Sequence, residues 1–373
     1  MVTENRFYVA HAAGPWARAA KNCRDQLEAA PAGANLGFVY VTDALGNDLS
    51  SILTFLRETT GVEDWVGTIG LGVCATGVEY FDEPALAVMV ASLPSDSFRV
   101  FRTVANDAQA IQHDHRDWLE RAQPGFGIVH GDPRNPRVPA LVAELAETAS
   151  VFLVGGLTSS RGAFDQVAGT VTQGGLSGVL FGGEVEVATG LSQGCTPIGP
   201  VHTVTESFDN VLAGLDGRPA LEVLEEDSGE SLADDPAGFA GLIDAALPIP
   251  GSDTGDYLVR NLVGVDAKHG FIIIGDRLSA GDKLMFVGRG RAEAEADMER
   301  MLANIARRIS RPPQGGLYIA CVGRGPNMFA DDAGELNMIR AKFGDFPFVG
   351  FFANGEISHN RLYGYTGVLT LFL

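Results

Sequence analysis

The stretch from residue 315 to residue 365 constrains the fold of this chain more than any other. Two short apolar runs, Leu317–Val322 and Phe346–Phe352, each lead into a glycine turn that carries a charged residue. Between them, residues 334–342 place apolar side chains at the spacing of one buried helix face. Strand, helix and strand in this order form a βαβ unit, whose strands are parallel and end at the same edge of a sheet. Ligands of open α/β sheets bind at that edge, so the two turns predict a binding site.

The same succession of elements occurs twice earlier, so that a helix–strand–helix–strand–strand unit is repeated loosely over residues 16–93, 107–187 and 293–373. In each copy the second strand carries a glycine, at Gly70, Gly155 and Gly350. A strand after the following turn is expected to return antiparallel. Any α/β chain shows some such alternation, so true repetition and ordinary alternation both stay open. Both predict mixed sheets flanked by helices.

A segment dense in Gly and Pro, residues 190–200, predicts a boundary because regular structure does not propagate through it. A chain of 373 residues is long enough for two domains. We therefore expect an α/β protein with two domains, residues 1–195 and 196–373. Within the second, an acidic helix with a loop is expected over residues 221–235, and strands over residues 202–211, 257–263 and 270–275.

Charge and composition restrict the partners and the compartment. The net charge is −20 with only 27 Lys and Arg, and these form no basic cluster, so we expect no nucleic-acid or membrane partner. The N-terminus lacks a secretory signal, and no run reaches the ~18 apolar residues of a spanning helix. Four scattered cysteines without CxxC spacing fit free thiols in a reducing cytoplasm.

The charged residues of the two glycine turns are the main candidates for ligand binding. A guanidinium at Arg324, between two glycines at a strand end, suits capture of a carboxylate. Glu356 could meet an amine, so that the two together would match an amino acid, with Asn327 and Asn354 lining the pocket. The alternative is a structural Arg324–Glu356 pair that braces the two loops.

Two cysteines are candidates for the same pocket. Cys195 lies in a Gly/Pro loop, where it could line the pocket, pack inertly or act as a nucleophile. Cys321 ends the first apolar run, where a small core residue is the simplest interpretation and a side chain turned toward the ligand the alternative.

The histidines give no metal signature. His113 and His115 are two residues apart on an expected helix and point to different faces, so we expect no metal site. The absence of CxxCH excludes c-type haem attachment, whereas a single axial histidine for b-type haem stays open.

Several segments resemble the FIST family of bacterial sensory proteins, with an N-terminal FIST domain followed by its C-terminal partner. The resemblance is carried by residues 153–166 (LVGGLTSSRGAFDQ), 193–206 (QGCTPIGPVHTVTE), 272–289 (IIIGDRLSAGDKLMFVGR), 318–329 (YIACVGRGPNMF) and 348–358 (FVGFFANGEIS). It implies a cytoplasmic sensor of amino acids or related metabolites. Some members resemble haem-binding nitric-oxide sensors. No transmitter, kinase or cyclase segment is recognisable, so the sensor would act through a signalling partner or through assembly into a homo-oligomer.

The first hypothesis is therefore a cytoplasmic protein that binds a small polar metabolite and is not an enzyme. The alternatives are a haem-based gas sensor, in which haem is the cofactor, and a cysteine-dependent enzyme that uses Cys195 or Cys321.

Overall fold

The computed structural model describes residues 6–29, 33–229, 243–249, 257–329 and 333–373. Its packing divides the chain into unit 1, residues 1–192 and 298–373, and unit 2, residues 193–297. The expected boundary at residue 195 lies near the point where the chain enters unit 2, and residues 298–373 return to unit 1. Unit 1 therefore has a core that both ends of the sequence share.

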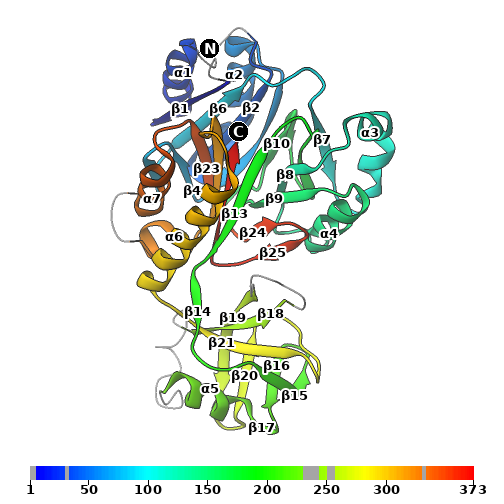
Figure 1. The fold of residues 1–373 in the computed structure, drawn as a ribbon, viewed down its shortest axis with the longest axis vertical. Helices are drawn as coiled ribbons and strands as arrows, with labels where there is room; N and C mark the ends of the chain where they lie inside the picture. The colour runs from blue at the N-terminus through cyan, green and yellow to red at the C-terminus, as the bar shows by residue number, and fades with distance from the viewer. Residues whose placement is uncertain (1–5, 30–32, 230–242, 250–256, 330–332) are drawn as a thin grey trace. The chain divides into compact units, whose positions relative to one another are not determined.

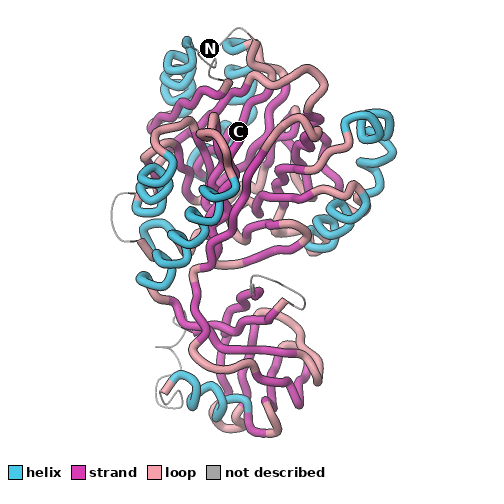
Figure 2. Tube along the Cα trace, in the orientation of Figure 1, coloured by secondary structure: helices cyan, strands magenta, loops and turns pink. Residues whose placement is uncertain are grey.

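Unit 1 contains three sheets of six strands each (Figures 1 and 2). The first has the order β1 (Phe7–Ala13), β6 (Ala85–Ala91), β2 (Leu36–Thr42), β3 (Asp64–Gly70), β10 (Gln166–Ala168) and β11 (Thr170–Thr172). The second has the order β7 (Phe98–Val104), β12 (Leu176–Phe181), β8 (Phe126–Gly131), β9 (Phe152–Leu157), β24 (Glu356–Ser358) and β25 (Arg361–Tyr363). The third has the order β13 (Val187–Gln193), β26 (Thr366–Phe372), β22 (Gly315–Cys321), β23 (Phe348–Ala353), β4 (Gly72–Ala75) and β5 (Val78–Phe81).

The centre of each sheet is a pair of parallel strands joined through a helix. The pairs are β2–β3, β8–β9 and β22–β23, and the strands β6, β12 and β26 return antiparallel beside them. The predicted βαβ layout of residues 315–353 is thus confirmed. It places the turns after β22 and β23 at one edge of the third sheet.

Helices cover the outer face of each sheet, as Figure 1 shows. They are α1 (Trp16–Gln26) and α2 (Leu49–Thr60) on the first sheet, α3 (Gln109–Ala122) and α4 (Val138–Thr148) on the second, and α6 (Arg291–Arg308) and α7 (Gly334–Phe343) on the third. Side chains alternate along each strand, so one face packs under helices and the other faces inward. The inward faces of all three sheets meet in one central core that includes Phe38, Ile128, Val154, Ile319 and Phe372.

The hairpin that follows each parallel pair leaves its own sheet. The hairpin β4–β5 follows β3 but pairs with β23, β10–β11 follows β9 but pairs with β3, and β24–β25 follows β23 but pairs with β9. The apolar run of residues 65–73 is for this reason divided between β3 and β4, which lie in different sheets.

Among the described residues, unit 2 is a closed antiparallel barrel on which a helix packs. Its strands are ordered β21 (Lys283–Arg289), β15 (His202–Phe208), β16 (Val211–Leu215), β20 (Phe271–Ile274), β19 (Tyr257–Asp266) and β18 (Ile243–Pro248), which pairs back with β21. The short strands β14 (Cys195–Pro197) and β17 (Arg218–Pro219) extend it. The predicted strand over residues 202–211 is two strands. Helix α5 (Ala220–Ser228) packs on the barrel core, and residues 230–235 of the predicted acidic helix lie outside the described residues.

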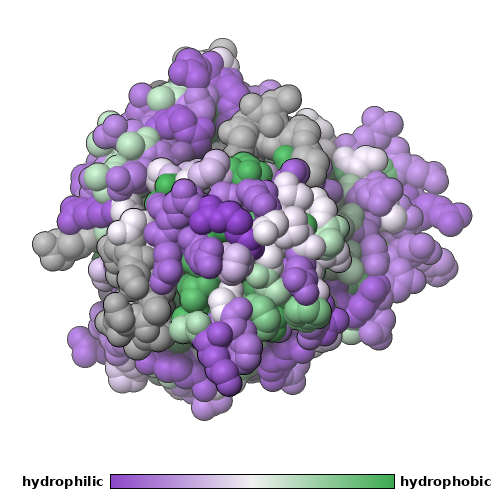
Figure 3. Space-filling view, turned by 90° about the horizontal axis from the view of Figure 1, so that it is seen from below, coloured by the Kyte–Doolittle hydropathy of each residue, from purple (hydrophilic) through white to green (hydrophobic). Residues whose placement is uncertain are grey.

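The face of the molecule drawn in Figure 3 carries polar residues over most of its area, with hydrophobic residues gathered toward its middle. Among the described residues of unit 2, the large hydrophobic side chains of Val201, Phe208 and Val263 are exposed. Within the described ranges we find no helix that could serve as a membrane span.

Candidate functional site

A fully buried ion pair lies where β22 ends. The guanidinium of Arg324 donates from Nη2 and Nε to Oε1 of Glu335, at 2.6 and 2.9 Å, and neither side chain is exposed to solvent. The hydroxyl of Tyr318 donates to the same oxygen, and the backbone N–H of Gly325 donates to Oε2. Glu335 stands in the first turn of α7, where the helix dipole favours an anion. A buried charge of either sign is stable only with such a partner.

The remaining donors of Arg324 reach neutral acceptors at longer range. Nη1 contacts the carbonyl oxygens of Tyr365 at 3.2 Å and of Ser192 at 3.5 Å, and Nη2 contacts the hydroxyl of Ser192 at 3.3 Å. The ring of Phe329 lies 5.1 Å from the guanidinium carbon. The cation is therefore held tightly on one side and loosely on the other.

Glu356 is close to Arg324 but is not its hydrogen-bond partner. Its Oε2 accepts from the backbone N–H and the hydroxyl of Thr366, at 3.1 and 2.7 Å, while its Oε1 has no partner among the described residues. Burial raises the pKa of this carboxyl to about 8, against the opposing effects of Thr366 and the Arg324 charge. The carboxyl is thus mainly protonated at neutral pH.

Another carboxyl, the half-buried Glu79, reaches the third sheet on the exchanged strand β5. Its Oε1 also lacks a partner within the described part of the chain. Burial, and then the charge of Glu335, raise its pKa to about 7. The third sheet and the turns that follow it therefore carry one guanidinium and three carboxyl groups, and two of these carboxyls have an oxygen without a partner among the described residues. Arg324, Glu335 and Glu356 lie at the strand ends, whereas Glu79 lies opposite Cys74 in the edge strand β5 and is coupled to them through the charge of Glu335. We call Arg324, Glu335, Glu356 and Glu79 the strand-end cluster.

The expected site residues divide into three groups. Arg324, Glu356 and Cys321 are all buried. They lie near one another, since the charges of Glu356 and Arg324 both act on the pKa of the Cys321 thiol. Asn327 and Asn354 are exposed on the same two turns: Asn327 Nδ2 donates to the carbonyl of Val322, and the backbone N–H of Asn354 donates to Leu157. Cys195 belongs to unit 2, where its carbonyl accepts a hydrogen bond from Tyr257.

The cysteines do not have the features of nucleophiles. All four are buried free thiols, and burial raises the pKa of Cys321 to about 12. A reactive cysteine needs the opposite shift and access to solvent. In this structure Cys321 is a buried acceptor, with the N–H of Gly323 3.5 Å from its sulfur.

The described residues contain no group of three or more metal-ligating side chains. His130 is buried in the central core, where its Nε2 lies 3.2 Å from the hydroxyl of Tyr40 and burial lowers its pKa to about 3. His202 lies between two aspartates of unit 2. No observation singles out one histidine as an axial haem ligand.

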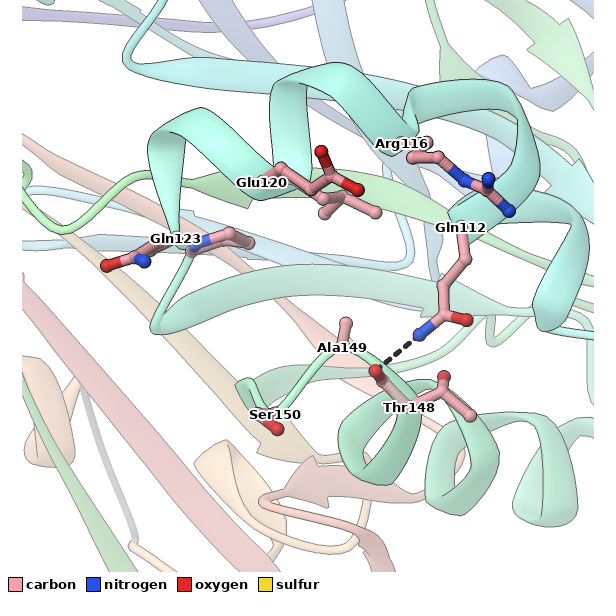
Figure 4. A pocket seen from close by; sticks show the side chains of 9 residues that line it. Gln112, Arg116, Glu120, Gln123, Thr148, Ala149 and Ser150 are labelled. Carbon is pink, nitrogen blue, oxygen red and sulfur yellow. Dashed lines mark hydrogen bonds between the residues drawn. The ribbon is translucent and has the colours of Figure 1, made fainter.

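A surface hollow of about 460 Å³ lies away from the strand-end cluster, between α3 and the end of α4 (Figure 4). Gln112 spans it by donating to the carbonyl of Thr148, and the side chains of Arg116 and Glu120 lie along the α3 side. Its charged side chains, Arg116 and Glu120, are both exposed. The buried chemistry thus favours the strand-end cluster over the hollow as the candidate site.

Sequence reasoning missed Glu335 and Glu79. The position of Glu335 could have been predicted, since an acidic residue in the first turn of the helix that follows Arg324 is placed to pair with it. The position of Glu79 could not, because only the exchange of hairpins brings β5 to the third sheet.

Comparison with known proteins assigns the chain to a family of sensory and signalling domains. Residues 35–218 match the FIST N domain and residues 220–359 match the FIST C domain. The chain belongs to the FIST family. It is 31% identical to the Mycobacterium tuberculosis protein Rv0628c over 323 residues, which is 83% of each chain. It is 30% identical to the Mycobacterium bovis protein Mb0898c over 374 residues, which is 95% of this chain and 94% of the relative.

Proposed function

We propose that this protein is a cytoplasmic sensor that binds a small polar metabolite carrying an amine and a carboxylate, such as an amino acid, at the strand-end cluster. The observation that carries the proposal is the buried Arg324 guanidinium near Glu356, a buried carboxyl whose Oε1 has no partner among the described residues. Buried polar atoms without partners are uncommon in proteins and point to a missing partner. The cluster also stands at the carboxyl end of parallel strands, where α/β sheets bind ligands.

The amine of the ligand would complete the acidic side of the cluster. Oε1 of Glu356 can accept a hydrogen bond once the carboxyl has lost its proton. An ammonium group supplies both the donor and the charge that favours this loss. Binding at neutral pH would then release about one proton from Glu356, since its pKa in the free protein is about 8.

The carboxylate of the ligand would take the loosely held side of Arg324. The contacts of Nη1 and Nη2 to Ser192 and Tyr365 are 3.2–3.5 Å long and involve neutral acceptors. A carboxylate there would form shorter, charge-assisted hydrogen bonds without breaking the pair with Glu335. Because the guanidinium is buried, the turn over residues 322–329 has to move, so ligand binding shifts a conformational equilibrium.

Calorimetry with a panel of amino acids and related acids tests this function. A ligand should bind with a heat that depends on the ionisation enthalpy of the buffer, as proton release requires. Glu356→Gln should abolish the buffer dependence and weaken binding at least tenfold. The matched control is Glu58→Gln, which alters an exposed glutamate of α2. If no member of the panel binds, or if Glu356→Gln and Arg324→Lys bind as the wild type does, the proposal is wrong.

We also propose that the ligand signal passes to a protein partner or to a second copy of the chain. We take unit 2 as the contact region, because a partner bound there would cover its exposed apolar side chains Phe208 and Val263. Sedimentation velocity with and without the ligand found by calorimetry distinguishes self-association from a need for another protein.

A third proposal concerns the architecture. We infer that unit 1 consists of three copies of one unit, over residues 7–91, 98–181 and 187–372, with unit 2 inserted into the third between β13 and α6. The order is strand, helix, strand, helix, strand, hairpin and strand in each, and all three hairpins are exchanged.

Close contacts at matching positions support the three copies. A Cβ at Gly67, Gly155 or Gly350 would lie within 1.8 Å of a carbonyl oxygen on the parallel neighbour, that of Val39, Val129 or Tyr318. The first of these glycines is Gly67 rather than the expected Gly70. The residues three positions further along those neighbours, Thr42, Asp132 and Cys321, each accept a backbone N–H from the chain at or just before the start of the returning strand. The donors are Ala85, Gly174 and Tyr365.

A further inference from the structure

His202 of unit 2 is held between two carboxylates. Its Nδ1 lies 2.7 Å from Oδ2 of Asp216 and its Nε2 lies 2.8 Å from Oδ2 of Asp227. Asp216 stands in the turn between β16 and β17, and Asp227 in the last turn of α5. The imidazole of β15 thus connects two other elements of the barrel.

Only the charged form of the ring satisfies both contacts. An imidazolium donates from both nitrogens, whereas a neutral imidazole has one N–H and one lone pair. A neutral ring would leave one carboxylate facing a lone pair at less than 3 Å. The geometry therefore defines the protonation state.

The residues around the His202–Asp227 contact favour a charged imidazole. The side chains of His202 and Asp227 are each only 8% exposed. The carboxylate of Asp227 occupies the place where a Cβ at Gly199 would lie, with its Oδ2 only 2.1 Å away. Asp227 is also an anion at the negative end of a helix dipole, and the last turn of α5 has no basic residue. The positive charge of His202 offsets both the charge of the Asp227 carboxylate and the negative end of the helix dipole.

We infer that His202 is a pH-dependent clamp that fastens α5 to the barrel while its ring is charged and loosens α5 when the ring becomes neutral. In the clamped state α5 buries Leu221, Val223 and Leu224 against the barrel core. Loosening exposes this apolar face. The inference does not depend on the ligand proposed above.

The charges that face the ring determine the direction of the effect. Burial lowers the pKa of His202, but the hydrogen bonds and charges of Asp216 and Asp227 outweigh it and the pKa is raised above 6.5. Glu226 of α5, paired with Arg218 of β17, adds a negative charge nearby, and Lys283 of β21 acts on Asp216. A raised folded-state pKa gives stability that is complete below pH 6.5 and is lost as the pH rises through the folded value.

Nitrogen-detected NMR of the imidazole rings in the intact protein tests the charge state directly. We expect His202 to show two protonated nitrogens at pH 6.5 and to titrate above this value. His269, whose Nδ1 contacts the exposed Asp266, is the internal reference. A single protonated nitrogen at pH 6.5, or a pKa at or below 6.5, would overturn the inference.

Hydrogen exchange tests the mechanical consequence. After correction for intrinsic rates, the opening equilibrium of the α5 amides should increase at least fivefold between pH 6.5 and pH 9 in the wild type. In His202→Gln and Asp227→Asn it should be larger than in the wild type at pH 6.5 and nearly independent of pH. His269→Gln should behave as the wild type. Equal pH dependence in all four proteins would show that His202 does not control α5.

Discussion

Arg324 and Glu335 form an ion pair 2.6 Å long in which both side chains are completely buried. The two residues stand on opposite sides of the turn after β22, so the pair joins the end of a central strand to the start of α7. Ion pairs at the surface contribute little, whereas removing one partner of a buried pair leaves an uncompensated charge.

Arg324→Met should therefore destabilise unit 1 by about 3–5 kcal/mol, measured by urea denaturation. The double variant Arg324→Met with Glu335→Gln should recover at least half of the loss, because the lone buried charge is gone while an acceptor for Tyr318 remains. Arg340→Met, which breaks the exposed pair with Asp345, serves as the control and should leave the free energy of unfolding unchanged within error. A double variant less stable than Arg324→Met alone would contradict this account of the pair.

The buried carboxyls make stability depend on pH near neutrality. The folded-state pKa of Glu356 is about 8, against 4.5 for an ordinary glutamate carboxyl, so the unfolded chain gives up its proton first. Between these values the protein should lose up to about 1.4 kcal/mol per pH unit from this group as the pH rises. Urea denaturation from pH 5 to pH 8 measures the slope. Glu356→Gln should flatten it, whereas Glu58→Gln should not.

The close approach at Gly350 is equally testable. A Cβ there would lie 1.6 Å from the carbonyl oxygen of Tyr318 in the neighbouring strand, a clash that no side-chain movement relieves. Gly350→Ala should cost about 4 kcal/mol or more, among the largest effects of single substitutions. Gly162→Ala is the matched control, since an added Cβ there meets nothing within 4 Å. Thermal unfolding of the two variants makes the comparison.

The thiols should react slowly. All four cysteines are buried, and the Cys321 thiol is protonated far above neutral pH. Iodoacetamide at pH 7 should modify every cysteine of the folded protein more slowly than free cysteine, and Cys321 should become reactive only on unfolding. Mass spectrometry of timed samples identifies the modified positions. Rapid modification of Cys321 or Cys195 in the folded protein would revive the enzymatic alternative.

If unit 2 is an insertion, unit 1 should fold without it. In the other two copies the first strand runs into the first helix through residues 14–15 and 105–108 alone. Replacing residues 194–289 by a linker of the length of residues 105–108 should give a folded protein with the far-UV and near-UV circular dichroism of a packed α/β core. An unfolded or molten product would argue against the three-copy arrangement.

Local pattern was sufficient to predict most of the secondary structure and the meeting of Arg324, Glu356 and Cys321. Hydrophobic runs and glycine turns report on a strand and its parallel neighbour, which lie within a few dozen residues of each other. The position of Glu79 in the third sheet, and the packing of residues 298–373 with the first 192 residues, depend on which strand each hairpin pairs with. This pairing is determined by packing between the sheets, so it cannot be predicted from the pattern within a single segment.

The exchange of hairpins also bears on how the protein is made. The first sheet is finished by β10–β11, the second by β24–β25 and the third by β4–β5. When the first 300 residues have been synthesised, all strands of the first sheet are present, whereas the second sheet still lacks its edge strands. These edge strands, β24 and β25, are made only with residues 356–363. The nascent chain must keep an open strand, β9, from pairing wrongly until residues 356–363 have been synthesised.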